Sequence, residues 1–455
     1  MSLADTISQL SSTFSGQLLQ PNDTGYDDAR RLHNGLIDKR PALIARCHGT
    51  ADVVDAVKLA RTLGLEVAVR GGGHNVAGRA TIEGGLMIDL APMKGISVGP
   101  RQRTVRAQGG VLWKELNRET QLHGLATTGG VVGTTGIAGL TLGGGLGWLM
   151  PKYGLALDNL RATELVMADG TVRHVTADEE PDLFWAIRGG GGNFGIATSL
   201  EYAVHPVGPT VTGGLVLHPL ARAGDLLKFF RDYCASLPDE IMVAAGMLTA
   251  PDGSNAKLAG VLACHCGSLA DGAKAVQPIK TFGPPIVDQM GPISYCAQNG
   301  LLDAALPKGA LNYWKAQFLT ELSDEAIATL VTCFERCTSP MTQIVLEHFH
   351  GAASRVPVGA TACAMRITGF NVVLISQWSD RRESDQHIKW CRETYAALRP
   401  HLGTFRYVNY LADDEAGDPV AAAYGPNYQR LRALKAKYDP DNFFHTNVNI
   451  TPLHR

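Results

Sequence analysis

The hydrophobic pattern near the start of the chain predicts a helix followed by a short strand. Apolar residues recur at helical spacing after Thr50, which we expect to cap the helix, and the pattern stops at Gly64, a residue suited to ending it. Residues 66–70 then alternate between polar and apolar side chains, as a strand does. We therefore expect the glycine-rich segment after Arg70 to leave the end of a strand.

The rest of the chain predicts a mixed architecture. Residues 181–187 have the pattern of a helix, and residues 196–202 alternate as a strand. Residues 341–349 and 372–378 alternate as well, with amphipathic helices between the strands of this region. The pattern thus predicts an α+β fold, and 455 residues exceed one typical domain of about 150 residues.

The distribution of glycine adds a candidate site. Of the 51 glycines, 27 fall between Gly71 and Gly195. Glycine is selected where φ must be positive or where the backbone must approach another surface closely. Clusters at 70–78, 127–148 and 188–195 therefore predict tight loops around one ligand, although each cluster alone is also consistent with the turns of a β-rich domain.

Two common phosphate-binding motifs fit these clusters poorly. The first cluster can form an anion-binding nest, but it lacks the Lys-Ser/Thr ending of a P-loop. The third contains a GxGxxG pattern at Gly190, Gly192 and Gly195, but its predicted helix precedes its strand, the reverse of a Rossmann unit. The second cluster alternates glycine with small hydroxyl and apolar residues, so it can lie flat against a planar ligand.

Charge and cysteine content narrow the function classes. With 41 basic and 43 acidic residues and a net charge of -2, the chain offers no basic surface for nucleic acid. No segment approaches the roughly 18 apolar residues of a membrane span, and the first residues do not resemble a secretion signal, so we expect a cytoplasmic protein without membrane contact. The nine cysteines lack zinc-site spacing, and neighbours in the trio 264–266 would point to opposite faces of a strand, so no metal is expected.

Taken together, the motifs carry a family resemblance. The segment RGGGHN at 70–75, the glycine-rich run 136–148 and the PKYGL segment at 151–155 resemble FAD-linked oxidases of the vanillyl-alcohol-oxidase superfamily, and more narrowly the berberine-bridge-enzyme-like branch. The third cluster and the C-terminal residues 438–449 match as well. The resemblance covers nearly the whole chain in order.

The resemblance implies a division into domains. A PCMH-type FAD-binding domain of two α+β subdomains would span residues 1–206, with its core at about 36–206. A substrate-binding domain at 207–400 would place a large antiparallel sheet over the flavin ring, and residues 401–455 would return to the FAD domain. The expected partners are a small-molecule substrate and dioxygen, and the expected assembly is a monomer or a homodimer.

The resemblance also implies that FAD is attached covalently through His74. A loop histidine is more often simply held by hydrogen bonds, but His74 matches the family's histidine that is joined to the 8α-methyl carbon of the flavin ring. A neutral imidazole can attack that carbon once the methyl group is deprotonated, and the bond raises the flavin potential. Many relatives add a cysteinyl bond, but Val132 stands at the corresponding position and no cysteine lies between residues 48 and 233. We therefore expect a single histidyl bond.

Further FAD contacts are implied in the first two clusters, directly after the third cluster and near the C-terminus. Asn447 and Asn449 match asparagines near the ring, and Ile196 matches a position whose backbone runs along the cofactor. The complete set of expected FAD-binding residues is Arg70, Gly71, Gly72, Gly73, His74, Asn75, Gly78, Gly130, Val131, Thr134, Thr135, Gly136, Gly139, Leu140, Gly143, Gly144, Gly147, Trp148, Ile196, Asn447 and Asn449.

The candidate catalytic residues lie on the substrate side. Tyr410 ends a Tyr-x-Asn-Tyr segment resembling one whose last tyrosine faces the substrate, and a phenolate there requires a nearby positive charge or the oxidised flavin to lower its pKa. The second group is Glu347, His348 and His350. On a strand the two histidines share one face and Glu347 takes the other, so only one set can reach the site. Relatives place an apolar side chain at Thr135, whose hydroxyl either orients dioxygen or caps a turn.

The expected function is that of an FAD-linked oxidase. A small organic substrate, such as an alcohol, amine, phenol or secondary-metabolite intermediate, would transfer a hydride to flavin N5, and dioxygen would reoxidise the flavin to give hydrogen peroxide. Two alternatives stay open. One is a monooxygenase or dehydrogenase on the same scaffold, using a flavin–oxygen adduct or another electron acceptor, and the other is a non-catalytic flavoprotein.

Overall fold

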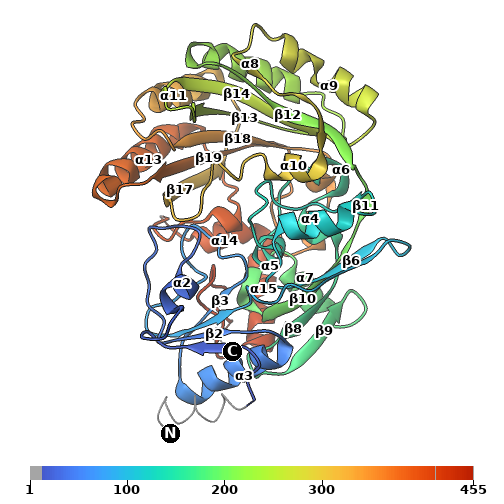
Figure 1. Ribbon diagram of the computed structural model, residues 1–455, viewed down its shortest axis with the longest axis vertical. Coiled ribbons are helices and arrows are strands. Elements are labelled where there is room, and N and C mark those ends of the chain that lie inside the picture. Colours follow the sequence, from blue (N-terminus) through green and yellow to red (C-terminus); the bar gives the residue numbers. More distant parts are fainter. Residues whose placement is uncertain (1–12, 416, 454–455) are drawn as a thin grey trace.

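This computed structural model describes residues 13–415 and 417–453. The described part of the protein has two halves. In Figure 1 one large sheet and the helices outside it form the upper half, and the N-terminal sheets form the lower half. The C-terminal helices, drawn in red, lie in the lower half although the large sheet separates them from it in sequence. The chain therefore leaves the N-terminal half and returns to it.

The first N-terminal sheet has the strand order β1-β2-β4-β3, and β4 lies parallel to both neighbours. Its strands are β1 (Gln17–Leu19), β2 (Leu43–Arg46), β3 (Val67–Arg70) and β4 (Leu86–Asp89), joined by helices α2 (Tyr26–Arg30) and α3 (Thr50–Leu63). Gly64 ends α3 with a φ of 64°, as predicted. The prediction for Thr50 was wrong, because Gly49 occupies the capping position and the Thr50 hydroxyl donates instead to Glu164 at 2.7 Å.

The second sheet is antiparallel and has the order β5-β6-β10-β8-β9. Its strands are β5 (Ile96–Gly99), β6 (Thr104–Gln108), β8 (Leu160–Val166), β9 (Val172–Thr176) and β10 (Ile196–Ala203), with a separate pair of β7 (Leu125–Ala126) and β11 (His205–Pro206). The helices are α4 (Trp113–Gln121), α5 (Ile137–Leu142), α6 (Met150–Tyr153) and α7 (Pro181–Ile187). As predicted, α7 precedes the third glycine cluster and β10 follows it, so the GxGxxG pattern is not part of a Rossmann unit.

The large sheet is antiparallel and has the order β15-β12-β14-β13-β18-β19-β17, with β16 also paired to β12. Its strands are β12 (Thr210–Pro219), β13 (Ile241–Thr249), β14 (Lys257–His265), β15 (Val287–Asp288), β16 (Gly291–Ser294), β17 (Leu311–Phe318), β18 (Gln343–Phe349) and β19 (Gly369–Trp378). The helices of this region are α8 (Ala223–Cys234), α9 (Leu269–Thr281), α10 (Tyr295–Gly300), α11 (Asp324–Glu335), α12 (Ala352–Arg355) and α13 (Ser384–Leu398). Strands β18 and β19 correspond to the alternating segments predicted at 341–349 and 372–378.

Side-chain alternation gives the two faces of this sheet different neighbours. On β18, Ile344 and Leu346 pack with the outer helices α8, α11 and α13. Val345 and Phe349, which point the other way, pack in clusters that face the N-terminal half. Odd-numbered residues of β18 therefore point toward the interface between the two halves.

The C-terminal segment returns to the third glycine cluster through helices α14 (Pro419–Tyr424) and α15 (Tyr428–Tyr438). The Lys435 ammonium is buried and contacts Asp439 at 2.6 Å and the Asn193 carbonyl at 2.7 Å. The Asn193 amide in turn donates to the Val448 carbonyl at 2.9 Å. These contacts hold the end of the chain against the N-terminal half.

The sheets and their helices confirm the predicted fold class, α+β with a large antiparallel sheet. In the part of the chain described, every helix is too short or too polar to cross a membrane.

Candidate active site

One pocket lies between the two halves, and all three glycine clusters contribute to its wall. Strand β17 and the C-terminal segment supply the remaining side. The predicted residues that line it are Gly71, Gly72, Gly73, His74, Asn75, Gly130, Val131, Thr135, Gly136, Gly139, Leu140, Tyr410 and Asn447. The fold thus brings most of the expected FAD contacts and one candidate base to the same space.

The first glycine cluster leaves the end of β3 and packs against the second. A Cβ atom on Gly72 would lie 2.4 Å from the backbone nitrogen of Gly136, so neither loop tolerates a side chain where they cross. Gly73 has a φ of 68°. The N–H groups of Gly72, Gly73 and His74 donate to no acceptor within the described residues, so they are available to an anion.

Arg70 and Gly78 support this loop from outside the pocket. The Arg70 guanidinium pairs with the buried carboxylate of Asp89 and donates to the Ala29 carbonyl. Gly78 has a φ of 74° and lies against Ile37. Neither residue lines the pocket, so the structure gives both a role in shaping the loop.

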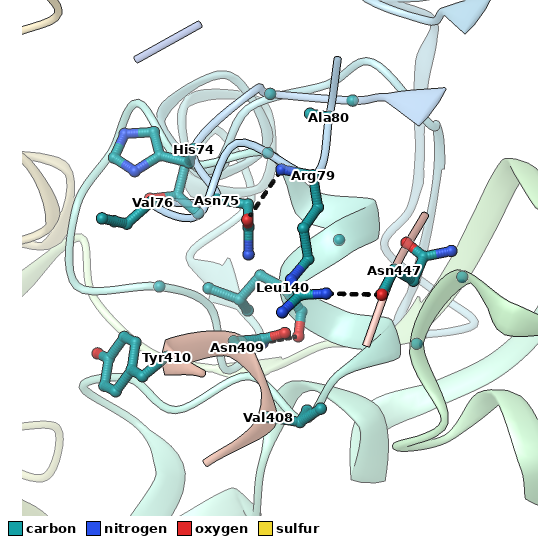
Figure 2. Close-up of a pocket in the computed structure, with 18 of the residues that line it drawn as sticks. His74, Asn75, Val76, Arg79, Ala80, Leu140, Val408, Asn409, Tyr410 and Asn447 are labelled. Carbon is teal, nitrogen blue, oxygen red and sulfur yellow. Dashed lines mark hydrogen bonds between the residues drawn. The ribbon is translucent and has the colours of Figure 1, made fainter. Parts of the chain in front are cut away.

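His74 stands at the edge of the pocket, and Figure 2 shows it on the opposite side of Asn75 from Arg79. Its Nε2 atom lies 3.0 Å from the hydroxyl oxygen of Thr134, and its ring stacks on His33 with the centroids 3.8 Å apart. Burial, helped by His33, lowers the pKa of His74 to about 3. The imidazole is therefore neutral at physiological pH.

Part of the second cluster serves a different purpose from the one expected. A Cβ atom on Gly143 would lie 2.0 Å from the side-chain oxygen of Asn409, and one on Gly144 would lie 2.9 Å from the Tyr407 ring. Gly147 packs on a backbone carbonyl in the same way, and Trp148 is buried in the core. These four predicted cofactor residues do not line the pocket, because they accommodate the C-terminal segment and the core.

The third cluster and the C-terminal strand complete the wall. Gly191 and Gly192 line the pocket beside Asn447. Ile196 is 2% exposed and packs in the core behind the first sheet. Asn449 lies outside the pocket lining, with its Oδ1 atom buried and without a hydrogen-bond partner in the described chain. Of the predicted contacts Ile196, Asn447 and Asn449, the structure places Asn447 at the pocket.

Arg79 is a pocket residue that the sequence motifs did not identify. Its Nη1 donates to the Asn447 carbonyl at 2.7 Å and its Nη2 pairs with Asp413 at 2.6 Å, while its Nε is buried without a partner among the residues described. Figure 2 shows its side chain extended from the first loop toward Asn447. At Gly139 a Cβ atom would meet nothing within 4 Å, so the wall leaves open space there.

This wall fits FAD. FAD combines a planar ring with a diphosphate. The pocket offers a glycine-lined surface, backbone N–H groups that have no acceptor in the described part of the chain, and the guanidinium of Arg79. Among the described residues that line the pocket there is no cysteine, so His74 is the candidate covalent ligand that they offer.

Tyr410 and Glu347 form a hydrogen-bonded pair on the substrate side. The Tyr410 hydroxyl donates to Glu347 Oε1 at 3.0 Å, and the Asn371 amide donates to Glu347 Oε2 at 2.8 Å. Burial raises the pKa of Glu347 to about 7, although both hydrogen bonds lower it. Burial and the neighbouring Glu347 carboxyl raise the pKa of Tyr410 well above its usual value. Glu347, and not a Tyr410 phenolate, is therefore the group poised to exchange a proton near neutral pH.

His348 and His350 are directed away from the pocket. Their rings stack on each other with centroids 4.7 Å apart, and His348 also packs on Phe370 among the residues of the outer face. Burial lowers the pKa of His348 to about 3. The expected alternation along β18 thus selects Glu347, and neither histidine reaches the substrate side.

Thr135 lines the pocket and also takes part in a turn. Its N–H donates to the Val132 carbonyl at 3.1 Å, and its own carbonyl accepts from the Trp113 N–H at 2.9 Å. Both contacts are made by the backbone of Thr135 and not by its hydroxyl.

Sequence reasoning missed several residues of the site. Trp314 lines the pocket, and its ring packs edge to face with Tyr410 at 6.1 Å between centroids. Asn371 contacts Glu347 across neighbouring strands, and His33 reaches His74 from the N-terminal segment. Arg79 lies close enough to the first glycine cluster to have been considered, but nothing in the pattern of the chain marks the other three.

Known proteins are similar to this chain in sequence and in fold. A family model described as an FAD binding domain matches residues 41–176, and one described as berberine and berberine like matches residues 406–451. The chain is 32% identical to (R)-6-hydroxynicotine oxidase of Paenarthrobacter nicotinovorans, over 96% of this chain and 97% of that protein. It is 31% identical to an FAD-linked oxidoreductase of Dictyostelium discoideum, over 91% of this chain and 89% of that protein. The crystal structure of 6-hydroxy-D-nicotine oxidase from Arthrobacter nicotinovorans matches with a TM-score of 0.89 and 30% identity, covering 97% of this chain and 99% of that one.

Proposed function

Because the chain belongs to the berberine-bridge-like family of FAD-linked oxidoreductases, we propose that it is an oxidase whose FAD is attached covalently through His74. A small organic substrate with a hydroxyl, phenol or amine group would transfer a hydride to the flavin, and dioxygen would receive the electrons to form hydrogen peroxide. The proposal rests on one observation: His74 and Tyr410 line the same pocket, and the Tyr410 hydroxyl donates a hydrogen bond to Glu347.

The state of His74 supports covalent attachment. The ring is neutral and its Nε2 lies 3.0 Å from the Thr134 hydroxyl oxygen. It stands at the end of a loop in which the N–H groups of Gly72 and Gly73 have no acceptor among the described residues. A neutral imidazole has the lone pair that bond formation to the flavin methyl carbon requires. Many relatives form a second bond to the flavin from a cysteine, and this chain has Val132 at that position. This difference supports a single bond, through His74.

Bound FAD supplies the hydride acceptor, and the protein supplies the path for the proton. We infer that the substrate hydroxyl or amine gives its proton to the Tyr410 oxygen while the Tyr410 proton passes to Glu347 Oε1. The high pKa of Tyr410 keeps it protonated until Glu347 can accept, and the Glu347 pKa of about 7 makes that acceptance possible at neutral pH. Asn371 holds the other carboxyl oxygen, so Oε1 remains directed toward Tyr410.

Denaturation in acid tests the attachment. We expect the yellow colour to stay with the precipitated wild-type protein and to be released from His74→Ala. His218→Ala is a matched control, because His218 is also a buried histidine but lies on β12, outside the pocket lining. Free release of flavin from the wild type would contradict covalent attachment while leaving FAD binding intact.

Reoxidation tests the oxidase reaction. The enzyme is reduced with a trial substrate without air and then mixed with dioxygen. Rapid reoxidation with one hydrogen peroxide per flavin is expected. Labelled oxygen in the product would instead indicate a monooxygenase, and slow reoxidation with fast transfer to an artificial acceptor would indicate a dehydrogenase.

The remaining parts of the proposal concern organisation. We propose the domain boundaries 1–206, 207–400 and 401–455, supported by the start of the large sheet at Thr210 and by the return of the C-terminal segment. A cytoplasmic location is supported by the nine free cysteines, since secreted proteins commonly pair theirs. The proposed assembly is a monomer or a homodimer, and sedimentation of the purified enzyme would distinguish the two.

A further inference from the structure

We propose that His33 is a positioning residue for cofactor attachment, because its stacked ring holds the His74 imidazole in the orientation from which it bonds to the flavin. The inference rests on the proposed attachment at His74. His33 lies in the N-terminal segment, outside the glycine-rich motif that carries His74.

Two contacts restrain the His74 ring. His33 covers one face, with ring centroids 3.8 Å apart and an angle of 24° between the planes. Thr134 holds the ring edge, with its Oγ1 atom 3.0 Å from Nε2. A face contact and an edge contact together oppose rotation about both side-chain torsions, and fixed orientation of a nucleophile is worth a large part of the barrier in a bond-forming step.

His33 is itself fixed by backbone hydrogen bonds to both halves of the molecule. Its N–H donates to the Gly73 carbonyl at 3.0 Å, and its carbonyl accepts from the Gly309 N–H at 2.9 Å. The adjacent Asn34 amide donates to the Val76 carbonyl at 2.8 Å. The N-terminal segment is therefore hydrogen-bonded to the flavin loop on both sides of His74, at Gly73 and at Val76, so the His33 backbone cannot move away without the loop.

The charge state favours the stack. Burial, together with the charge of Lys308, lowers the pKa of His33 to about 4, and the His74 pKa is lower still. Two neutral imidazoles stack without charge repulsion. The Nε2 of His33 is buried without a hydrogen-bond partner in the described chain, so the polar atom has been desolvated with no compensating bond. The His33 ring is therefore held by its stack on His74 and not by a hydrogen bond from Nε2.

The stack would act on one bond-forming step. Attachment breaks a C–H bond of the flavin methyl group and the imidazole N–H bond, and it forms a C–N bond. The two electrons and two protons remain on the flavin ring until dioxygen removes them as hydrogen peroxide. His33 takes no part in the exchange of atoms, so its substitution should change the rate of attachment and leave the affinity for FAD unchanged.

The test measures how fast flavin becomes acid-stable. Full-length wild type, His33→Ala and His33→Phe are produced under riboflavin limitation and then incubated with FAD, and acid-precipitated samples are read by flavin fluorescence. We expect His33→Ala to be roughly two- to tenfold slower than wild type, the range that loss of one ring stack gives. We expect His33→Phe, which keeps a flat ring, to stay close to wild type. Equal rates for all three proteins would overturn the proposal, and so would a His33→Phe as slow as His33→Ala.

Further variants separate stacking from folding. His33→Leu keeps most of the volume without a flat ring, and it should be as slow as His33→Ala. Total FAD bound before acid treatment and the thermal midpoint report whether each variant folds. If wild type itself releases its flavin in acid, the proposed attachment fails as well. If wild-type flavin is acid-stable and the Leu variant matches it in rate, only the role of His33 is contradicted.

Discussion

The two walls of the pocket are built in opposite ways. The flavin-facing wall contains glycines at 71–73, 130, 136, 139, 191 and 192, where the backbone borders the pocket without a side chain. The substrate-facing wall consists of side chains, among them Trp314 from β17 and Tyr410 from the C-terminal segment, backed by Glu347 of β18. The first wall depends on the absence of side-chain atoms, and the second depends on particular ones. We therefore expect substitutions in the first to remove the cofactor and substitutions in the second to slow turnover.

The largest effect is expected for Gly72→Ala. The added Cβ would lie 2.4 Å from the nitrogen and 2.6 Å from the Cα of Gly136, and both are backbone atoms that cannot turn aside. Separating the two loops should cost about 3 kcal/mol and abolish FAD retention. Flavin absorbance per protein after purification, with the urea midpoint, measures both effects. Flavin content equal to wild type would contradict the backbone character of this wall.

Gly139→Ala sharpens the same comparison. Gly139 lies inside helix α5 and lines the pocket, and a Cβ there meets no protein atom within 4 Å. Alanine should therefore raise the stability of the protein without flavin by about 1 kcal/mol, because it favours the helix, and should lower FAD affinity. Gly224→Ala, which also adds a Cβ in open space on a helix but far from the pocket, is the control with unchanged flavin.

On the substrate wall, Glu347→Gln should have the strongest effect. It removes the proton acceptor while keeping the shape of the side chain, so kcat should fall by about 10²- to 10⁴-fold with FAD content unchanged. Wild-type activity should rise with pH through about 7, where the carboxyl ionises, and the variant should lose this dependence. Glu335→Gln, at an exposed carboxylate of α11, is the matched control. A variant within tenfold of wild type would exclude Glu347 as the base.

The same residue links pH to stability. The folded pKa of Glu347 is raised from 4.5 to about 7, so its stabilising contribution is complete below about 4.5 and is lost as pH rises through 7. Glu347→Gln should therefore gain stability over wild type by on the order of 3 kcal/mol between pH 5 and pH 8. Thermal unfolding at the two pH values measures the difference. A constant difference would show that the carboxyl does not ionise in this range.

Asn371→Leu should give an intermediate effect. The Asn371 amide stabilises the charged form of Glu347, so its loss should raise the Glu347 pKa and move the rising limb of the activity profile upward by about one pH unit. Gln377→Leu removes another buried amide of β19 that does not contact Glu347, and its profile should stay in place. If the pH–activity profile of Asn371→Leu is not shifted, ionisation of Glu347 does not cause the rise of activity with pH.

The smallest effect is expected for His348→Phe. Its ring lies on the outer face of the sheet, and its Nδ1 is buried without a partner in the described residues, so phenylalanine removes no known hydrogen bond at that atom. Activity should stay within about twofold of wild type, and stability within about 1 kcal/mol. Steady-state kinetics on the same substrate is sufficient. A large loss of kcat would contradict the assignment of this face.

The sequence predicted the local elements well where a strong periodic pattern or a special backbone conformation was present. Gly64 ended α3 as expected, and β18 and β19 formed where alternation was found. The alternation rule also separated Glu347 from His348, but it could not say which of the two faced the pocket. The prediction failed at Gly143 and Gly144, which were expected to contact the flavin. A pattern of glycines shows that something packs closely against the backbone, but it does not show that the neighbours here are Asn409 and Tyr407.

By itself, the sequence determined the glycine-rich loops, the histidine at the end of the first loop and the family to which they are similar. Each of these depends on backbone conformation or on a local motif, and local rules act on neighbouring residues. Only the tertiary structure decided that Glu347 contacts Tyr410 and Asn371, and that His33 stacks on His74. Those contacts join residues far apart in the chain, and their geometry follows from strand register and from how the two halves pack.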